Sequence, residues 1–407
     1  MKDERSAAYE LAILALLFLF WGSVGLNRLG IGAIFPSIVP EFHLEGWQTG
    51  LLISGTSVTW AVSSWVGGWL SDRHGRRKIL LPAVGFVALM TAAMGGAWNF
   101  LSMFIVRDLL GIGDGVGWSV GQATVNEESS PERRGINQAV FTVGYTLIGV
   151  GIGAIIITRL TVLLGWRLVF PLIGAATALI ALALVLVMRE PQTRRAERAD
   201  WREAVGLLRD PSLVFVTVAG CAVLTWLAVF VGYNTLYLTK ARGFALPDAG
   251  LVTSIWGFSG AAGQILLPLL SDRLGRRPVI FVAAVVSAAT LGLYLLGGYD
   301  VWPTRLLAGL CGFCGFGLLP IVLATCVSES VSDEQRGAAL GMTNFFGVII
   351  GTSLMPLIAG LLSDRSLAAS LGLAVAAQLV VAAAMLFVKE TAPRIVARRA
   401  APAGATA

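Results

Sequence analysis

The hydrophobic residues of this chain fall into twelve long apolar stretches separated by short polar segments. Each stretch is close to the roughly 20 apolar residues that a helix needs to cross the hydrocarbon core of a membrane. The pattern therefore predicts an all-α integral membrane protein with twelve transmembrane helices. We expect the helices at residues 11–36, 48–70, 79–97, 99–124, 136–163, 167–188, 212–239, 249–270, 279–297, 302–327, 338–362 and 367–388.

A polar motif occurs twice, each time between two apolar stretches. The first copy begins at Gly68 and contains Asp72, Arg73, Gly75 and Arg76; the second begins at Pro268 and contains Asp272, Arg273, Gly275 and Arg276. A duplicated pattern of this kind is typical of transporters built from two pseudo-symmetric bundles. The sequence predicts two six-helix bundles, residues 1–188 and 212–390, with a cytoplasmic linker at 189–211 and a disordered cytoplasmic tail at 391–407.

Composition and charge agree with a membrane protein. Hydrophobic residues make up 56% of the chain and charged residues 13%, which excludes an ordinary soluble globular protein. Most of the 30 Lys and Arg lie in the polar segments of one side, so both termini should be cytoplasmic. The net charge of +6 then faces anionic lipid and needs no nucleic-acid partner. The excess of Arg over Lys and the absence of an Asn-x-Ser/Thr sequon favour a bacterial inner membrane.

The sequence contains no pattern that calls for a metal or a cofactor. All four cysteines lie inside predicted spans, and Cys311-Gly-Phe-Cys314 has no His or Asp nearby, so close helix packing is the better interpretation than zinc. The glycines between Gly111 and Gly117 lie within a span, where helix contact explains them better than a nucleotide loop does. No nucleophile and base stand at a recognisable spacing, so we expect no enzyme activity.

Ionisable residues inside the spans are the strongest candidates for function, because such residues normally face a cavity or a partner. Arg28 follows Asn27 in the first span. In the fourth span, Arg107, Gly111 and Asp114 stand at i, i+4 and i+7, which places them on one helix face. Asp108 is a second acid in the same helix. It either takes part in proton binding or only neutralises an Arg.

The chain resembles the major facilitator superfamily over essentially its whole length, with the duplicated motif as the most diagnostic feature. The combination of Arg28 and Asp114 further resembles the anion:cation symporter family, which contains proton-coupled transporters of sugar acids. That resemblance implies that Arg28 binds a substrate carboxylate and that Asp114 handles a proton. The chain departs from the family pattern in having Asn27 where an Asp is common and Asp114 where a Glu is common.

The duplicated motif also suggests a gate. An acid near a helix end and a cluster of guanidiniums can form charge-assisted bonds that latch one conformation and release in another. The alternative interpretation is that these Arg residues only set the topology, and the two are compatible. The second copy has Pro268 in place of Gly68, so we expect the first copy to be the more important gate.

Polar residues in the spans of the second half are candidates for substrate contact, although bonding between helices explains them equally well. They are Tyr233, Asn234, Tyr237, Gln264 and Asn344, and Arg107 joins them in the first half.

Together these features predict a monomeric transporter that couples uptake of a small organic anion, such as a sugar acid or an aromatic acid, to protons by alternating access. The alternative is a proton-driven exporter of drugs or metabolites. The guanidiniums and the absence of a Gly-Pro pair in the fifth span argue against it. A transport-dead receptor is a third interpretation, but no soluble signalling domain is attached.

Overall fold

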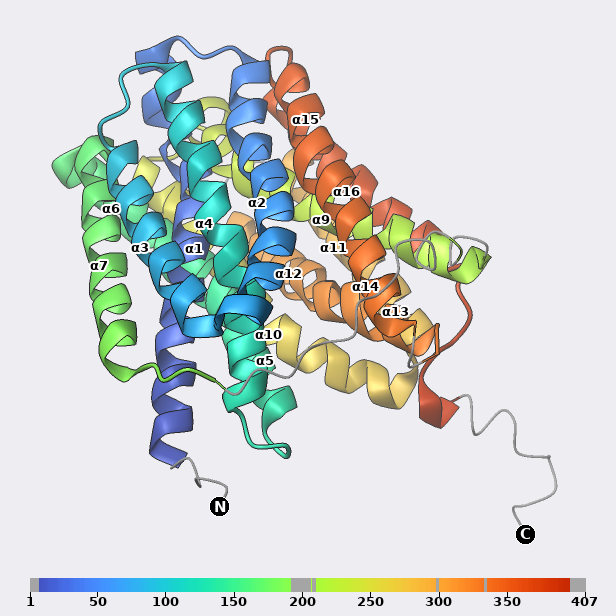
Figure 1. The fold of residues 1–407 in the computed structure, drawn as a ribbon. Coiled ribbons are helices and arrows are strands. Elements are labelled where there is room, and N and C mark those ends of the chain that lie inside the picture. Colours follow the sequence, from blue (N-terminus) through green and yellow to red (C-terminus); the bar gives the residue numbers. More distant parts are fainter. Residues whose placement is uncertain (1–6, 192–205, 207–209, 298–299, 333–334, 396–407) are drawn as a thin grey trace. The chain divides into compact units, whose positions relative to one another are not determined.

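The computed structural model describes residues 7–191, 206, 210–297, 300–332 and 335–395, and these are almost entirely helical (Figure 1). Most of the predicted linker and most of the predicted tail lie outside the described residues. The helices are α1 (Ala7–Phe42), α2 (Gly46–His74), α3 (Arg76–Met94), α4 (Phe100–Glu128), α5 (Arg134–Gly144), α6 (Gly153–Leu164), α7 (Trp166–Val187), α9 (Pro211–Leu236), α10 (Leu246–Leu274), α11 (Arg276–Leu296), α12 (Val301–Pro320), α13 (Cys326–Glu329), α14 (Arg336–Phe346), α15 (Met355–Ser363) and α16 (Leu367–Ala384).

Four π-helical stretches connect or extend these helices: Tyr145–Ile152, Tyr237–Ala241, Ile321–Thr325 and Gly347–Leu354. With them, the described chain forms one long helical segment at each of the twelve predicted places, which confirms the predicted all-α class. Ten segments are long and apolar enough to cross a membrane. The other two, α2 and α4, carry more polar residues, and they pack closely against each other.

The predicted helix ends are less accurate than the predicted helices. The first span was expected at 11–36, whereas α1 runs from Ala7 to Phe42. The hydrophobic pattern marks only the part of a helix that meets lipid, and the polar turns at both ends leave no such mark. At the other end of the chain, Ala392 is buried and Thr391 donates a hydrogen bond to Glu329, so packing continues past Glu390.

Packing groups the chain into two compact units, residues 1–196 with 234–254 and residues 197–233 with 255–407. In the first unit, α4 lies between α2 and α3, and α3 also packs on α7. Residues 234–254 belong to this unit, and Gly250 lies in close contact with Thr158 of α6. The two predicted six-helix bundles, residues 1–188 and 212–390, were assigned from the order of the spans along the chain. This division stays a prediction.

In the second unit, α11 packs against both α12 and α16. A closed aromatic cluster fills its interior: Trp226, Phe230, Trp256 and Phe316 are all 0% exposed. The rings of Phe230 and Trp256 stack with 4.4 Å between their centroids. All four cysteines are buried and free, and Ser287 donates a hydrogen bond to the carbonyl of Cys311. The Cys-x-x-Cys motif therefore belongs to helix packing, as the sequence predicts.

Glycines allow helices in the first unit to approach one another closely. A Cβ atom at Gly149, in the π-helical stretch Tyr145–Ile152, would stand 2.6 Å from the Cα of Gly25 in α1. A Cβ atom at Gly111 would likewise collide with Thr59 of α2. In both contacts, the two helix backbones can approach this closely only because the glycine carries no side chain.

Gly149→Ala should therefore destabilise the purified protein by about 1–3 kcal/mol, the usual cost of overpacking a tight contact. Gly85→Ala is the matched control, because Gly85 lies in α3 with nothing within 4 Å of an added Cβ. Thermal unfolding in detergent measures both variants. Equal Tm values for the two variants would contradict the assignment of Gly149 to a tight contact between backbones.

Candidate functional site

Arg107 is wholly enclosed in the first unit and is bound to two other helices. It is 1% exposed. From α4 its Nε donates to the carbonyl of Leu52 at 2.7 Å, its Nη1 to the carbonyl of Asn27 at 3.4 Å, and its Nη2 to Oγ1 of Thr56 at 3.3 Å. The guanidinium thus ties α4 to α1 and α2, and each of its three nitrogens has a protein acceptor.

Arg28 is the more accessible guanidinium. It is half-buried, and its Nη2 donates to Oγ of Ser57 at 2.9 Å. Its guanidinium carbon lies 5.2 Å from the ring centroid of Trp60, which is cation-π distance. Two contacts from α2 therefore hold the side chain in place while part of it stays open to a ligand.

Asp114 and Asn27 are buried polar groups without hydrogen-bond partners. Asp114 is 0% exposed, and neither of its carboxylate oxygens has a partner. Arg28 and Arg107 are close enough to interact with it electrostatically. Asn27 is also 0% exposed, and both polar atoms of its side chain are unpaired. Since most buried polar groups in proteins are paired, two unpaired groups beside Arg28 mark this region as a candidate site.

Asp108 lies on a different face of α4 from Asp114. Its Oδ1 stands 2.8 Å from the position of a Cβ atom added to Gly55 in α2. Its neighbours along α4, Ile105 and Ile112, are strongly exposed apolar side chains, as expected for a face toward lipid. The two acids proposed from the sequence therefore have different surroundings, and Asp114 is the one next to Arg28.

Aromatic side chains surround this region, and the sequence analysis did not single them out. The ring centroid of Trp21 lies 4.6 Å from that of Trp118 and 5.3 Å from that of Tyr145. Trp60 and Trp118 are 6.4 Å apart. A signal was present: Trp21 precedes Arg28 by two helical turns, and Trp118 follows Asp114 by one, so each shares a helix face with a charge.

The polar residues predicted in the second half have different contacts. Tyr233 is 0% exposed and donates to the carbonyl of Pro356 at 3.1 Å. Asn234 is equally buried and donates to Thr253, while Tyr237 accepts a hydrogen bond from Arg242. Bonding between helices or within one helix accounts for these three.

The remaining two predicted residues, Gln264 and Asn344, lie in the second unit. Gln264 is half-buried and its Oε1 has no hydrogen-bond partner. Asn344 is exposed and donates to the carbonyl of Leu340, one turn earlier in α14.

The duplicated motif forms the same charge network in both units. Arg76 contacts Asp72 at 2.6 Å and Glu127 at 2.9 Å, and it donates to Ser71. Arg276 contacts Asp272 at 2.5 Å and Glu329 at 3.0 Å, and it donates to Ser271. Gly75 and Gly275 have φ of 100° and 103°, a region that favours glycine, and each separates two helices. Arg73 lies over the ring of Trp69 rather than in the network.

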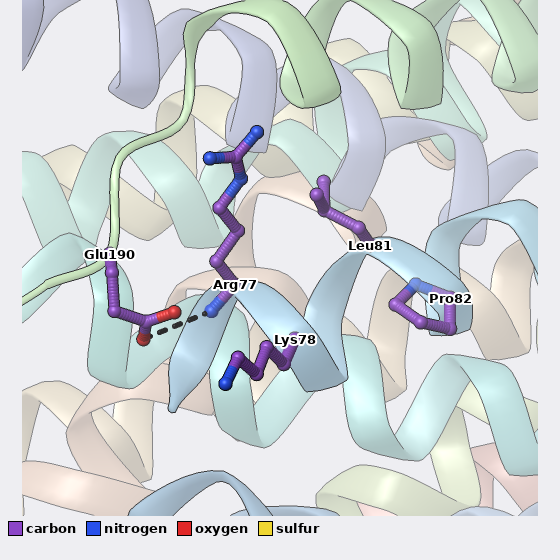
Figure 2. A pocket seen from close by; sticks show the side chains of 5 residues that line it. All are labelled: Arg77, Lys78, Leu81, Pro82 and Glu190. Atoms are coloured by element: carbon purple, nitrogen blue, oxygen red, sulfur yellow. Dashed lines mark hydrogen bonds between the residues drawn. The ribbon is translucent and has the colours of Figure 1, made fainter. Parts of the chain in front are cut away.

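A further acid completes each network, and the sequence analysis missed it. Glu190 accepts a hydrogen bond from the backbone NH of Arg77, and Glu390 accepts them from those of Arg276 and Arg277. Each acid therefore caps the first turn of a helix, where negative charge is favourable. Figure 2 shows the first of these contacts at the rim of an open pocket of about 540 Å³, lined by Arg77, Lys78, Leu81, Pro82 and Glu190.

This fold defines the class of the protein. It is a multi-pass helical membrane protein with a duplicated charge network. The family model of the Major Facilitator Superfamily matches residues 13–351 and 228–406, so the chain belongs to that superfamily of transporters.

Relatives and solved structures agree. The chain is 27% identical to a probable 4-methylmuconolactone transporter of Cupriavidus pinatubonensis, covering 86% of this chain and 84% of the relative. It is 24% identical to a probable L-galactonate transporter of Escherichia coli, covering 92% and 88%. A bacterial homologue of the lysosomal transporter Spinster has the same fold, with a TM-score of 0.78, 17% identity and coverage of 94% and 97%.

Arg107 and Arg28 should differ in what their removal does to stability. Arg107→Ala removes three hydrogen bonds between helices, and a hydrogen bond to a charged group is worth about 1.5–3 kcal/mol, so Tm should fall by several degrees. Arg28→Ala removes one such bond from a half-buried side chain, so its Tm should fall by clearly less than that of Arg107→Ala. Thermal unfolding of both proteins in the same detergent measures the difference. A larger loss of Tm in Arg28→Ala would reverse the two roles.

Proposed function

We propose that this transporter couples the uptake of a small organic carboxylate to protons. The observation that carries the proposal is the juxtaposition of a half-buried Arg28 with a fully buried, unpaired Asp114. An accessible guanidinium is suited to a carboxylate, which it can bind through two parallel hydrogen bonds. Named functions of relatives support the acidic substrate, since these include a probable L-galactonate transporter and a 3-(3-hydroxyphenyl)propionate transporter.

Coupling follows from competition for the positive charge of Arg28. In the empty site, Arg28 and Arg107 stabilise the ionised form of Asp114 against the cost of burial. A substrate carboxylate bound to Arg28 cancels part of that stabilisation, so binding of a proton to Asp114 becomes more favourable. Substrate and proton then enter together, and the reverse applies on release. Arg107 stays bound to its three acceptors throughout and positions both groups.

Arg28 also argues against export of cationic drugs, because a partly open guanidinium repels a cation. For the orientation, the distribution of Lys and Arg supports cytoplasmic termini in a bacterial inner membrane. Under that orientation, both charge networks lie on the cytoplasmic side, where they can act as latches. We expect the protein to work as a monomer.

The first test concerns Asp114. Asp114→Asn keeps the size of the side chain but cannot bind and release a proton. Proteoliposomes should therefore no longer accumulate substrate in response to a pH gradient, while counterflow exchange of substrate across the membrane continues. Asp108→Asn is the matched control on the same helix and should still accumulate substrate. Accumulation by Asp114→Asn at the parental level would refute the assignment of the proton to Asp114.

The second test concerns the shape of the cation at position 28. Arg28→Lys keeps the charge but offers no planar fork, and loss of one hydrogen bond to a charged group costs about 1.5–3 kcal/mol. Carboxylate binding should therefore weaken about tenfold or more, with Tm unchanged. Isothermal titration calorimetry on both proteins measures the effect. Parental affinity in Arg28→Lys would mean that Arg28 does not hold the carboxylate.

The third test concerns the latch. Glu127→Gln removes the charge that pairs with the nearly buried Arg76, so the conformation held by this network should become less populated. Glu132→Gln, an exposed position a few residues away, is the control. Accessibility of a single engineered cysteine to a membrane-impermeant thiol reagent, measured from each side, reports the populations. Identical labelling in both variants and the parent would leave the network with a purely structural role.

A further inference from the structure

Aromatic rings beside Arg28 are arranged in two layers. Trp21 and Phe141 are enclosed, at 5% and 0% exposure, and their ring centroids are 5.7 Å apart. Trp118 packs on both rings. Its ring centroid lies 4.6 Å from that of Trp21 and 5.9 Å from that of Phe141, and its side chain is only half-buried. A half-buried indole supported by two buried rings presents a rigid apolar face.

Two more half-buried rings extend this face toward the charged groups. The ring centroid of Trp60 lies 6.4 Å from that of Trp118, and the guanidinium of Arg28 lies over the Trp60 ring. Tyr145 contacts Trp21 from the start of the π-helical stretch, and it interacts electrostatically with Arg28 and Asp114. The indole NH of Trp60 has no hydrogen-bond partner. This buried donor would gain a partner if a ligand held at Arg28 placed an oxygen atom beside it.

The second unit offers a contrast that separates a site from a core. Its cluster of Trp226, Phe230, Trp256 and Phe316 is fully buried, so no ring face is accessible there. The first cluster differs in having three half-buried rings and a cation in contact with one of them. Simple core packing explains the closed cluster and does not explain the open one.

The exposed ring faces themselves offer few hydrogen-bonding groups, because the unpaired side chains of Asn27 and Asp114 are both 0% exposed. The hydroxyl of Ser57 accepts from Arg28, and that of Thr56 accepts from Arg107. A polyhydroxylated acid placed on the aromatic rings would leave several hydroxyls unpaired, at about 1–3 kcal/mol for each buried group. A flat unsaturated skeleton carries no such groups and gains about 0.5–1.5 kcal/mol from each well-placed ring contact.

We propose that Trp60, Trp118 and Tyr145 form an aromatic wall next to Arg28 that selects carboxylates with a flat, unsaturated carbon skeleton over polyhydroxylated acids. The proposal rests on the proposed function in one respect, namely that Arg28 binds the carboxylate. The wall adds the second half of the recognition: the charge goes to Arg28, the ring or conjugated system lies on Trp118 and Trp60, and the indole NH of Trp60 takes a substrate oxygen.

The test is calorimetric binding of four probes to the full-length protein: 3-phenylpropionate, 3-cyclohexylpropionate, D-gluconate and the uncharged 3-phenylpropanol. We expect 3-phenylpropionate to bind at least tenfold more tightly than D-gluconate and more tightly than its saturated analogue. Trp118→Leu should weaken 3-phenylpropionate about 3- to 10-fold, the equivalent of one lost ring contact, and should leave 3-cyclohexylpropionate less affected. Trp60→Phe keeps a ring but loses the indole NH, so it should weaken both propionates by a similar factor of about 3- to 10-fold.

Trp65→Leu is the control, because Trp65 lies in the same helix as Trp60 and is 78% exposed. It should leave all four affinities unchanged. Since Trp118→Leu disturbs packing against Trp21, its Tm is measured as well, and Trp60→Phe serves as the milder second variant.

The outcomes separate this inference from the proposed function. Equal or tighter binding of D-gluconate than of 3-phenylpropionate overturns the aromatic wall and leaves the carboxylate transporter standing. Tight binding of 3-phenylpropanol with no gain from the carboxylate supports the wall and overturns the role of Arg28. Failure of all four probes to bind, or tryptophan variants with unchanged affinity and unchanged preference, overturns the wall.

Discussion

The enclosure of Arg107 is the interaction on which the first unit depends. A guanidinium inside an apolar helix is expensive unless its donors are satisfied, and here three helices supply the solution: the donors come from α4, and the acceptors from the carbonyls of Leu52 and Asn27 and the hydroxyl of Thr56. Once α1, α2 and α4 are fixed in this way, the faces that carry Arg28, Trp60 and Asp114 are fixed as well. The site is therefore a consequence of how the fold accommodates one buried charge.

Against that background, the unpaired groups are informative. The same helices that satisfy Arg107 leave Asp114 and Asn27 without partners, although both are completely buried. A structural role alone would favour replacing such groups with apolar ones, because an unpaired buried polar group costs more than a nonpolar group of the same shape. Their presence next to a half-open Arg28 is understandable if ligand and proton complete the network during part of the transport cycle.

Much of the fold could be predicted from the sequence, because membrane spans are marked by length and hydropathy and the charge networks by a repeated motif. The spans were expected in the correct places, and the duplicated motif does form matching networks around Arg76 and Arg276. Glu190 and Glu390 were not foreseen as members, since contacts between residues more than a hundred positions apart leave no local pattern. The π-helical stretch at Tyr145, which places that ring near Arg28, has no sequence signature either.

The candidate site was only partly predictable, for a related reason. Ionisable residues stand out in an apolar span, so Arg28, Arg107 and Asp114 could be named, but their roles depend on which nitrogen or oxygen already has a partner. Aromatic residues do not stand out, because an apolar span contains many of them and most are core. The difference between the open cluster near Trp118 and the closed cluster near Trp256 lies in exposure.

The two units therefore share a charge network of the same kind and differ in their interiors. The duplicated networks have the same Asp, Arg and Glu contacts. In the described part of the first unit, the guanidinium of Arg28, the unpaired buried Asp114 and half-buried aromatic rings occur together. The second unit instead contains the fully buried aromatic cluster around Trp256. In the proposed mechanism, a carboxylate on Arg28 and a proton on Asp114 are coupled over a short distance, within one set of helices. That arrangement needs no long-range relay, because electrostatic coupling between neighbouring charges in a low-dielectric interior is strong.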